Sequence, residues 1–217
     1  MIKTTLQRIY VTLIFIFLYA PIVTLIVLSF NASKTRAKWG GFTTKWYTSL
    51  FQNEAIMNAL ANTLLIAFAA SIVSTLIGTI ACIAIMNLKK RSRAIVMGIT
   101  NIPMLNAEIV TGISLMLLFV AYQRFAAQSA WLPDNIMGLP TLLIAHIAFN
   151  VPYVIFNVSP KLKQLDIKLY EAALDLGCDP RQAFFKVILP EISPAILSAF
   201  LICLTYSIDA FMISYFN

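Results

Sequence analysis

Apolar runs long enough to cross a lipid bilayer recur along the whole of this 217-residue chain. About 20 consecutive apolar residues suffice for one crossing by a helix. Lipid offers no water to hydrogen-bond the backbone, so segments that span it in this way must be helical. The sequence predicts five such spans, over residues 9–30, 59–86, 95–122, 139–158 and 192–216. We therefore expect an all-α integral membrane protein in which residues 1–217 form a single transmembrane domain.

Composition supports this class. Hydrophobic residues make up 60% of the chain and charged residues only 12%, which excludes an ordinary soluble domain. The first apolar run follows Lys3 and Arg8, as a secretory signal peptide would. Its apolar stretch is too long for a signal peptide and no A-x-A-like cleavage site follows, so we expect a retained span.

The distribution of Lys and Arg predicts the orientation. With the N-terminus in the cytoplasm, eleven of the 16 basic residues fall inside and five fall outside, as the positive-inside rule requires. The outer five are Lys34, Arg36, Lys38, Lys45 and Arg124. The three tryptophans, Trp39, Trp46 and Trp131, then also lie in outer segments, where aromatic side chains anchor a protein at the interface. The charge of +7 is thus a topology signal, and no basic soluble surface suggests a nucleic-acid partner.

Several chemistries have no motif in this sequence. The three cysteines, Cys82, Cys178 and Cys203, are scattered and none falls on the outer side of the membrane, so we expect neither a disulfide nor a metal site. The chain has no G-x-x-x-x-G-K-[ST] phosphate loop, no nucleophile elbow and no H-E-x-x-H zinc helix. We therefore expect no catalytic residue, no cofactor and no enzyme activity, and any ATP chemistry must come from another subunit.

A polar segment, residues 159–191, separates the fourth and fifth predicted spans. Residues 165–176 have the spacing of a short amphipathic helix. Its apolar face consists of Leu165, Leu169, Ala172, Ala173 and Leu176. Gly177 follows directly and is suited to the left-handed conformation that ends a helix.

A second short helix is predicted after this glycine. Asp179 is suited to be its N-cap and Pro180 to be its first residue. Leu189 and Pro190 are expected to end it and to turn the chain back into the membrane.

The order of residues in this segment, YEAALDLGCDPRQAFFKVILP from Tyr170 to Pro190, closely resembles the EAA loop of permease subunits of ATP-binding-cassette importers. The resemblance implies an importer-permease (MetI-like) helical bundle that docks on a separate ATPase through this loop. The coupling residues it implies are Glu171, Ala172, Ala173, Gly177, Leu189 and Pro190. It also implies as partners a dimer of ATP-binding subunits, a second permease subunit and an extracytoplasmic substrate-binding protein, all at a bacterial cell membrane.

Four further stretches are similar to the polyamine branch of these permeases, the spermidine/putrescine importers. They are YAPIVTLIVLSFNASK (19–34), WGGFTTKWYTSLF (39–51), AHIAFNVPYVI (145–155) and TYSIDAFMISYF (205–216). Permeases of this kind usually have six spans, so the resemblance implies that the usual sixth is missing after residue 217. That branch often has a second acid after the position of Asp209, where this chain has Ala210.

Three ionisable residues lie well inside the predicted spans, where such groups are expensive and usually functional. They are Glu108, His146 and Asp209. At 1.5 Å per residue, Glu108 lies roughly 20 Å and Asp209 roughly 25 Å from the inner boundary, with His146 about 10 Å below the outer one. Two carboxylates in the outer half would attract a polyammonium chain, and Tyr122, Phe149 and Tyr206 could add cation–π contacts.

Other interpretations of these residues remain open. Asp209 could lie at the interface of a tilted helix, and His146 could serve only to hydrogen-bond between packed helices. The same three groups could instead form the proton relay of a secondary transporter, although the inverted repeats typical of many such transporters are not visible. Importer permeases for another small solute and a non-transporting scaffold are further alternatives.

Overall fold

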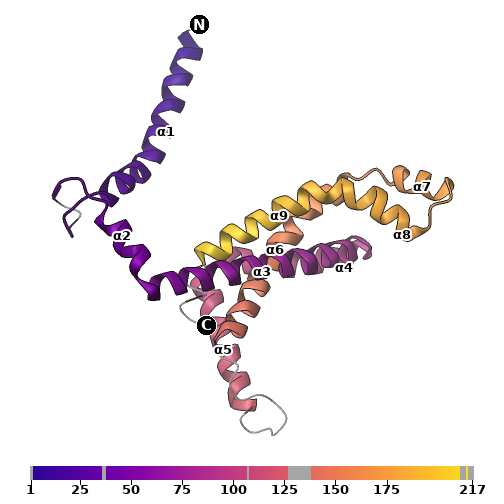
Figure 1. Ribbon diagram of the computed structural model, residues 1–217. Helices are drawn as coiled ribbons and strands as arrows, with labels where there is room; N and C mark the ends of the chain where they lie inside the picture. The colour runs from indigo at the N-terminus through magenta and orange to yellow at the C-terminus, as the bar shows by residue number, and fades with distance from the viewer. Residues whose placement is uncertain (1, 36–37, 107, 127–137, 211–213, 215–217) are drawn as a thin grey trace. The chain divides into compact units, whose positions relative to one another are not determined.

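The computed structural model describes residues 2–35, 38–106, 108–126, 138–210 and 214 (Figure 1). Its helices are α1 (Ile2–Ser29), α2 (Lys45–Gln52), α3 (Glu54–Met86), α4 (Lys90–Leu105), α5 (Glu108–Ala126), α6 (Leu139–Gln164), α7 (Ile167–Asp175), α8 (Pro180–Ala183) and α9 (Leu189–Asp209), with a π-helical turn η1 (Phe184–Ile188) before α9. No β-strand occurs within these described ranges. Five helical stretches there are long and apolar enough to cross a membrane, which confirms the predicted all-α class and number of spans.

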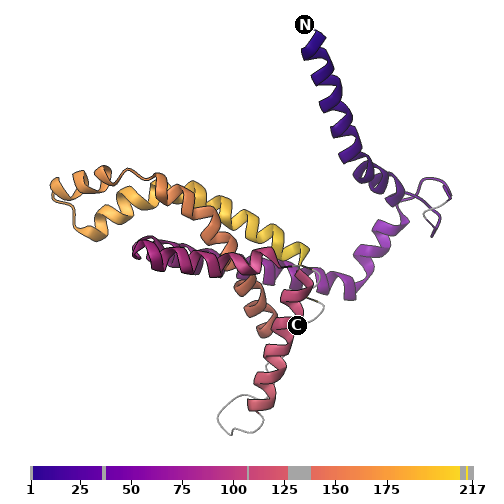
Figure 2. The same cartoon turned by 180° about the vertical axis from the view of Figure 1, so that it is seen from behind.

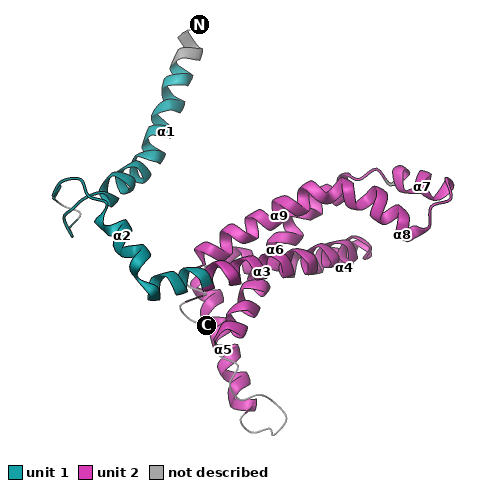
Figure 3. Ribbon diagram, in the orientation of Figure 1, with its two compact units in different colours: residues 1–61 teal, residues 62–217 magenta. Residues whose placement is uncertain are grey.

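The chain divides into two compact units, residues 1–61 and residues 62–217 (Figure 3). The expectation of one transmembrane domain over the whole chain remains a prediction. In the first unit, the loop after α1 is organised by Asn31, which is only 3% exposed. Its side-chain amide donates to the Lys38 carbonyl at 2.8 Å and accepts from the Gly40 N–H at 2.7 Å. One asparagine therefore closes this loop.

The second unit is built around the packing of α6 against α9, with α3 beside them. Its largest buried cluster contains Cys82, Ile85, Val154, Ile155, Val158, Ala199 and Cys203. Helix α3 approaches α6 closely at Gly78, where an added Cβ would lie 2.6 Å from the Cβ of Val154. Small residues let helix backbones approach closely in membranes, so the glycine fixes this crossing.

The third predicted span, residues 95–122, is two helices in the structure. Helix α4 ends at Leu105 and its cap residue, Asn106, has extended backbone angles of φ −79° and ψ 147°. The two helices run in different directions from this break in both views (Figures 1 and 2). Only α5 is long and apolar enough to be a candidate span. Pro103 lies inside α4, where a proline favours a kink, and the break follows three residues later.

The fifth predicted span also differs from the structure, because its helix begins much earlier and ends earlier. Helical structure is continuous from Pro180 to Asp209, passing through the π turn. Leu189 and Pro190 are therefore the first residues of α9 and do not end a helix, contrary to the sequence prediction. A proline removes one N–H and its ring collides with the carbonyl four residues before it. The wider π turn, in which the Leu189 N–H donates to the Phe184 carbonyl, ends two residues before that proline and accommodates it without a break.

Candidate functional site

The 159–191 segment lies at one end of the second unit, where α7 and α8 meet beyond the ends of α6 and α9 (Figures 1 and 2). Helix α7 begins after Asp166, whose carboxylate accepts a hydrogen bond of 3.0 Å from the Lys168 N–H. This N-cap satisfies one of the backbone donors that the first turn of a helix leaves free. The predicted amphipathic helix is therefore present, over Ile167–Asp175 in place of 165–176.

Gly177 ends α7 as predicted, with a left-handed φ of +84°. The Gly177 N–H donates to the Leu174 carbonyl at 2.9 Å, and the Cys178 N–H donates to the Ala173 carbonyl at 3.1 Å. This pair of bonds is the Schellman motif, which satisfies carbonyl groups at a helix C-terminus. A Cβ at Gly177 would meet no heavy atom within 4 Å, so its backbone angle alone favours glycine in the isolated chain.

The second short helix begins at Pro180 as predicted, with Asp179 in the N-cap position. The Asp179 carbonyl accepts the first helical bond, from the Ala183 N–H at 2.9 Å. The Asp179 side chain makes no capping hydrogen bond, so this residue contributes through its backbone.

Helix α7 exposes two large apolar side chains. Ala173 is buried at 8% exposure, whereas Leu169 and Leu176 are 53% and 86% exposed. Glu171 and Ala172 are exposed as well. Of the predicted coupling residues, the structure thus places Glu171, Ala172 and Gly177 at the surface, while Leu189 and Pro190 lie at the start of α9. Two large apolar side chains beside a glutamate form a surface suited to a protein groove.

A groove of about 760 Å³ lies between α7 and the helix ends that adjoin it. Its walls come from the ends of α3 and α6, from α7 and from the start of α9. Among the lining residues are Met86, Leu162, Leu169, Phe184, Pro190 and Glu191. Sequence reasoning missed this groove, because it depends on how the helix ends are placed in space.

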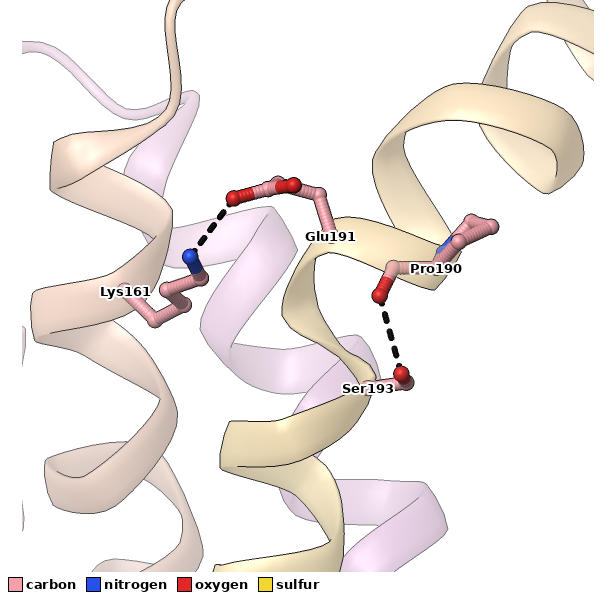
Figure 4. Close-up of polar contacts among 4 residues, drawn as sticks. All are labelled: Lys161, Pro190, Glu191 and Ser193. Carbon is pink, nitrogen blue, oxygen red and sulfur yellow. Dashed lines mark hydrogen bonds and ion pairs between the residues drawn. The ribbon is translucent and has the colours of Figure 1, made fainter.

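One ion pair ties the two ends of this segment together. The Lys161 ammonium on α6 lies 2.6 Å from the Glu191 carboxylate on α9 (Figure 4). Two residues further along α9, the Ser193 hydroxyl donates to the Pro190 carbonyl at 2.8 Å. The two charged side chains are 34% and 48% exposed. A pair so open to solvent contributes about 0–1 kcal/mol, so it orients the helix ends more than it stabilises them.

A second candidate site gathers predicted pathway residues near the start of α5. Glu108 is half-buried in the first turn of α5, and its Oε1 has no hydrogen-bond partner among the described residues. Its carboxylate is close enough to His146 and to Tyr153 for an electrostatic interaction with each. His146 is 2% exposed and its Nδ1 lies 2.8 Å from the Leu142 carbonyl. Glu108 is therefore at a helix N-terminus, and not in the middle of a continuous span as predicted.

Three aromatic rings adjoin this group. Tyr153 lies between the other two, with ring-centre distances of 5.3 Å to Phe149 and 4.6 Å to Tyr206. Phe149 and Tyr206 meet edge to face at 6.4 Å. The structure thus brings together Glu108, His146, Phe149 and Tyr206 from three helices, and it adds Tyr153. That residue follows Phe149 by one helical turn, a spacing that could have revealed it.

Asp209 does not join this group in the structure. It is the last residue of α9 and is exposed, so it is not well inside a span as predicted. No ion pair of Asp209 is seen within the described part of the chain. Within the described part of the chain, Tyr122 on α5 makes no ring contact with Phe149, Tyr153 or Tyr206.

A buried polar contact that sequence reasoning missed joins α6 to α9. The Asn150 side chain is fully buried and its amide donates to the Ser207 hydroxyl at 2.7 Å. The Asn150 carbonyl also lies 3.8 Å from the Cys203 thiol. Hydrogen bonds of this kind fix the register of helices packed in a membrane.

Five candidate spans and a capped helix between the last two define a multi-pass membrane protein. The family model described as "Binding-protein-dependent transport system inner membrane component" matches residues 74–216. The chain belongs to this family. Its predicted importer-permease fold is thereby confirmed.

Curated relatives and a solved structure are also similar to this chain. The chain is 38% identical over 204 residues to the putrescine transport system permease protein PotI of Escherichia coli K12, covering 93% of this chain and 70% of PotI. It is 35% identical over 216 residues to the spermidine/putrescine transport system permease protein PotC of the same strain, covering 100% of this chain and 78% of PotC. A crystal structure of a bacterial ABC transporter involved in alginate import matches with a TM-score of 0.73 at 19% identity, covering 95% of this chain and 74% of that one. This last likeness shows the fold alone.

Proposed function

We propose that this chain is the permease subunit of an ATP-driven importer of polyamines, with its N-terminus in the cytoplasm. The coupling part of the proposal depends on one observation: α7 ends in a Schellman turn at Gly177 and exposes Leu169 and Leu176. This preformed, exposed apolar surface supports docking on an ATPase. The substrate part draws on the relatives, whose names specify putrescine and spermidine transport.

The partners follow from this assignment. Two ATPase subunits would supply the energy, a second permease would complete the membrane pathway, and an extracytoplasmic binding protein would deliver the substrate. Closure of the ATPases would move α7, together with the helices joined to it. The family description, which names binding-protein-dependent transport, supports this set of partners.

The proposed substrate path contains Glu108, His146, Tyr153 and Tyr206. A half-buried carboxylate whose Oε1 lacks a hydrogen-bond partner can accept an ammonium group, and the three adjoining rings offer cation–π faces. Asp209, exposed at the end of α9, would act as an outer attraction site. The His146 Nδ1 donates to the Leu142 carbonyl of its own helix at 2.8 Å, which suits a packing role in the same path.

Substitutions at Gly177 test the coupling assignment. Gly177→Asp and Glu171→Lys should abolish uptake and pull-down of the ATPase while membrane insertion stays normal. A side chain at residue 177 would meet nothing within 4 Å in this chain, so harm from its bulk must come from a partner. Gly177→Asn is the matched uncharged variant, since asparagine tolerates left-handed angles. Normal pull-down and normal uptake in all three variants would refute the assignment.

Neutralisation of Glu108 tests the substrate path. Glu108→Gln keeps the shape and removes the charge, so uptake of radiolabelled putrescine into liposomes should fall about tenfold, as the loss of roughly 1.4 kcal/mol of binding would give. Asp209→Asn should cost less, because water screens an exposed charge. Glu54→Gln, an acid at the start of α3, is the matched control.

The rival mechanism, proton-coupled transport, is separated in the same vesicles. Uptake by an ATP-driven importer requires ATP and persists when the proton gradient is collapsed. Uptake through a proton relay of Glu108 and His146 requires the gradient and no ATP. Uptake unchanged in Glu108→Gln, Asp209→Asn and the double variant would leave the cation path without support.

A further inference from the structure

Helix α7 is joined to a long helix on each side. Toward α6, the chain passes through two non-helical residues, Leu165 and Asp166, the extended link. Toward α9, it passes through four non-helical residues, 176–179, which contain the Schellman turn at Gly177 and the extended Asp179, and then through helix that is unbroken from Pro180 to Asp209. Neither link is helical, so the contacts of α7 decide which long helix its displacement reaches first.

The packing around α7 distinguishes its two sides. Helix α7 contacts α8 and the π turn. The groove of about 760 Å³ separates its side chains from the end of α6 at Leu162 and from the end of α3 at Met86. A displacement of α7 therefore reaches α9 first, through α8 and the π turn.

Lys161 and Glu191 lie where this path enters the membrane helices. Glu191 is in the first turn of α9, directly after Pro190, and its carboxylate holds the Lys161 ammonium of α6 at 2.6 Å (Figure 4). The buried contacts between α6 and α9, such as Asn150 to Ser207, lie further into the helices. The ion pair is thus the polar connection between α6 and α9 nearest to the extended link.

We infer that α9 is the helix driven by the ATPase and that the Lys161–Glu191 pair, together with the apolar packing of α6 on α9, makes the loop end of α6 follow it. This inference rests on the proposed coupling through α7 and names the path beyond that contact. Lys161 and Glu191 are positioning residues: they touch neither substrate nor ATP. Separation of the pair would leave docking intact and would let ATP hydrolysis proceed with less transport.

Charge reversal tests the pair directly. The importer, reconstituted in liposomes with its ATPase, second permease and binding protein, is assayed for labelled putrescine taken up per ATP hydrolysed. Lys161→Glu and Glu191→Lys should each lower this ratio about fivefold, as the replacement of an exposed attraction by a repulsion of similar size would give. The double reversal, Lys161→Glu with Glu191→Lys, should restore it. ATPase pull-down should be unchanged in all three.

Lys163→Glu is the matched control, since Lys163 is on the same helix and forms no ion pair within the described part of the chain. It should leave the ratio unchanged. A double reversal that does not recover, or a ratio that stays normal in both single variants, would overturn the inference. If the parent importer neither bound the ATPase nor took up putrescine, that result would instead refute the proposed function, on which the inference rests.

Discussion

Helices α1 and α3 are both apolar enough to cross a membrane, but they differ in what they bury. Helix α1 exposes most of its large apolar side chains, among them Phe17 at 81%. Helix α3 buries a row of small residues from Ala67 to Cys82, which includes Ser71, Ser74 and Gly78. In lipid, large apolar side chains gain little by packing on another helix, whereas small ones allow close backbone approach. Small residues, and not the most apolar ones, therefore mark the packed face of a membrane helix.

The largest expected effect comes from filling the α3–α6 contact. In Gly78→Leu, the new Cβ would lie 2.6 Å from the Val154 Cβ and 3.3 Å from the Val151 carbonyl oxygen, so the two helices must separate. Overpacking of this kind costs about 3 kcal/mol. The free energy of unfolding, measured by denaturant titration in detergent micelles, should fall accordingly.

Gly98→Leu is the matched control on α4, because a Cβ at residue 98 meets nothing within 4 Å. It should be neutral or slightly stabilising, since leucine favours helix over glycine by about 0.5–1 kcal/mol. Equal losses in both leucine variants would show that glycine flexibility, and not close packing, matters at residue 78.

An intermediate effect is expected at the buried polar contact. Asn150→Leu removes the 2.7 Å bond to Ser207 and leaves a buried hydroxyl without its donor. Interhelical hydrogen bonds in membranes contribute about 0.6 kcal/mol on average, so a loss of about 1 kcal/mol is expected. A double-mutant cycle with Ser207→Ala measures the pair. Additive losses in the double variant would show that the two side chains do not act together.

The sequence predicted those parts of the structure that depend on local chemistry. Lipid demands helical backbone, so the number of spans followed from apolar length alone. Gly177 was predicted as a cap because only a few residue types adopt its left-handed angles. The effects of Pro103 and Pro190 were harder to predict, because a proline perturbs a helix without specifying whether a kink, a break or a π turn results. Its spacing from Phe149 could have revealed Tyr153, but the contact of Tyr153 with Tyr206, 53 residues away, depends on the register of α6 on α9, which is a tertiary property.

The smallest effect is expected on α1. Ile26→Ala trims a side chain that is 56% exposed, so the isolated chain should lose less than about 0.5 kcal/mol of unfolding free energy, as exposed positions usually do. Ile192→Ala is the matched variant on α9, where the same residue type is fully buried. It should cost about 2 kcal/mol or more, because the cavity left behind forfeits contacts on every side. Both are measured by the same denaturant titration.

A loss above 1 kcal/mol for Ile26→Ala would mean that large apolar side chains on α1 pack within this chain. The distinction between packed faces of small residues and lipid-facing surfaces of large ones would then fail. A loss that appears only when the variant is titrated within the assembled importer would instead make α1 a contact for a partner subunit.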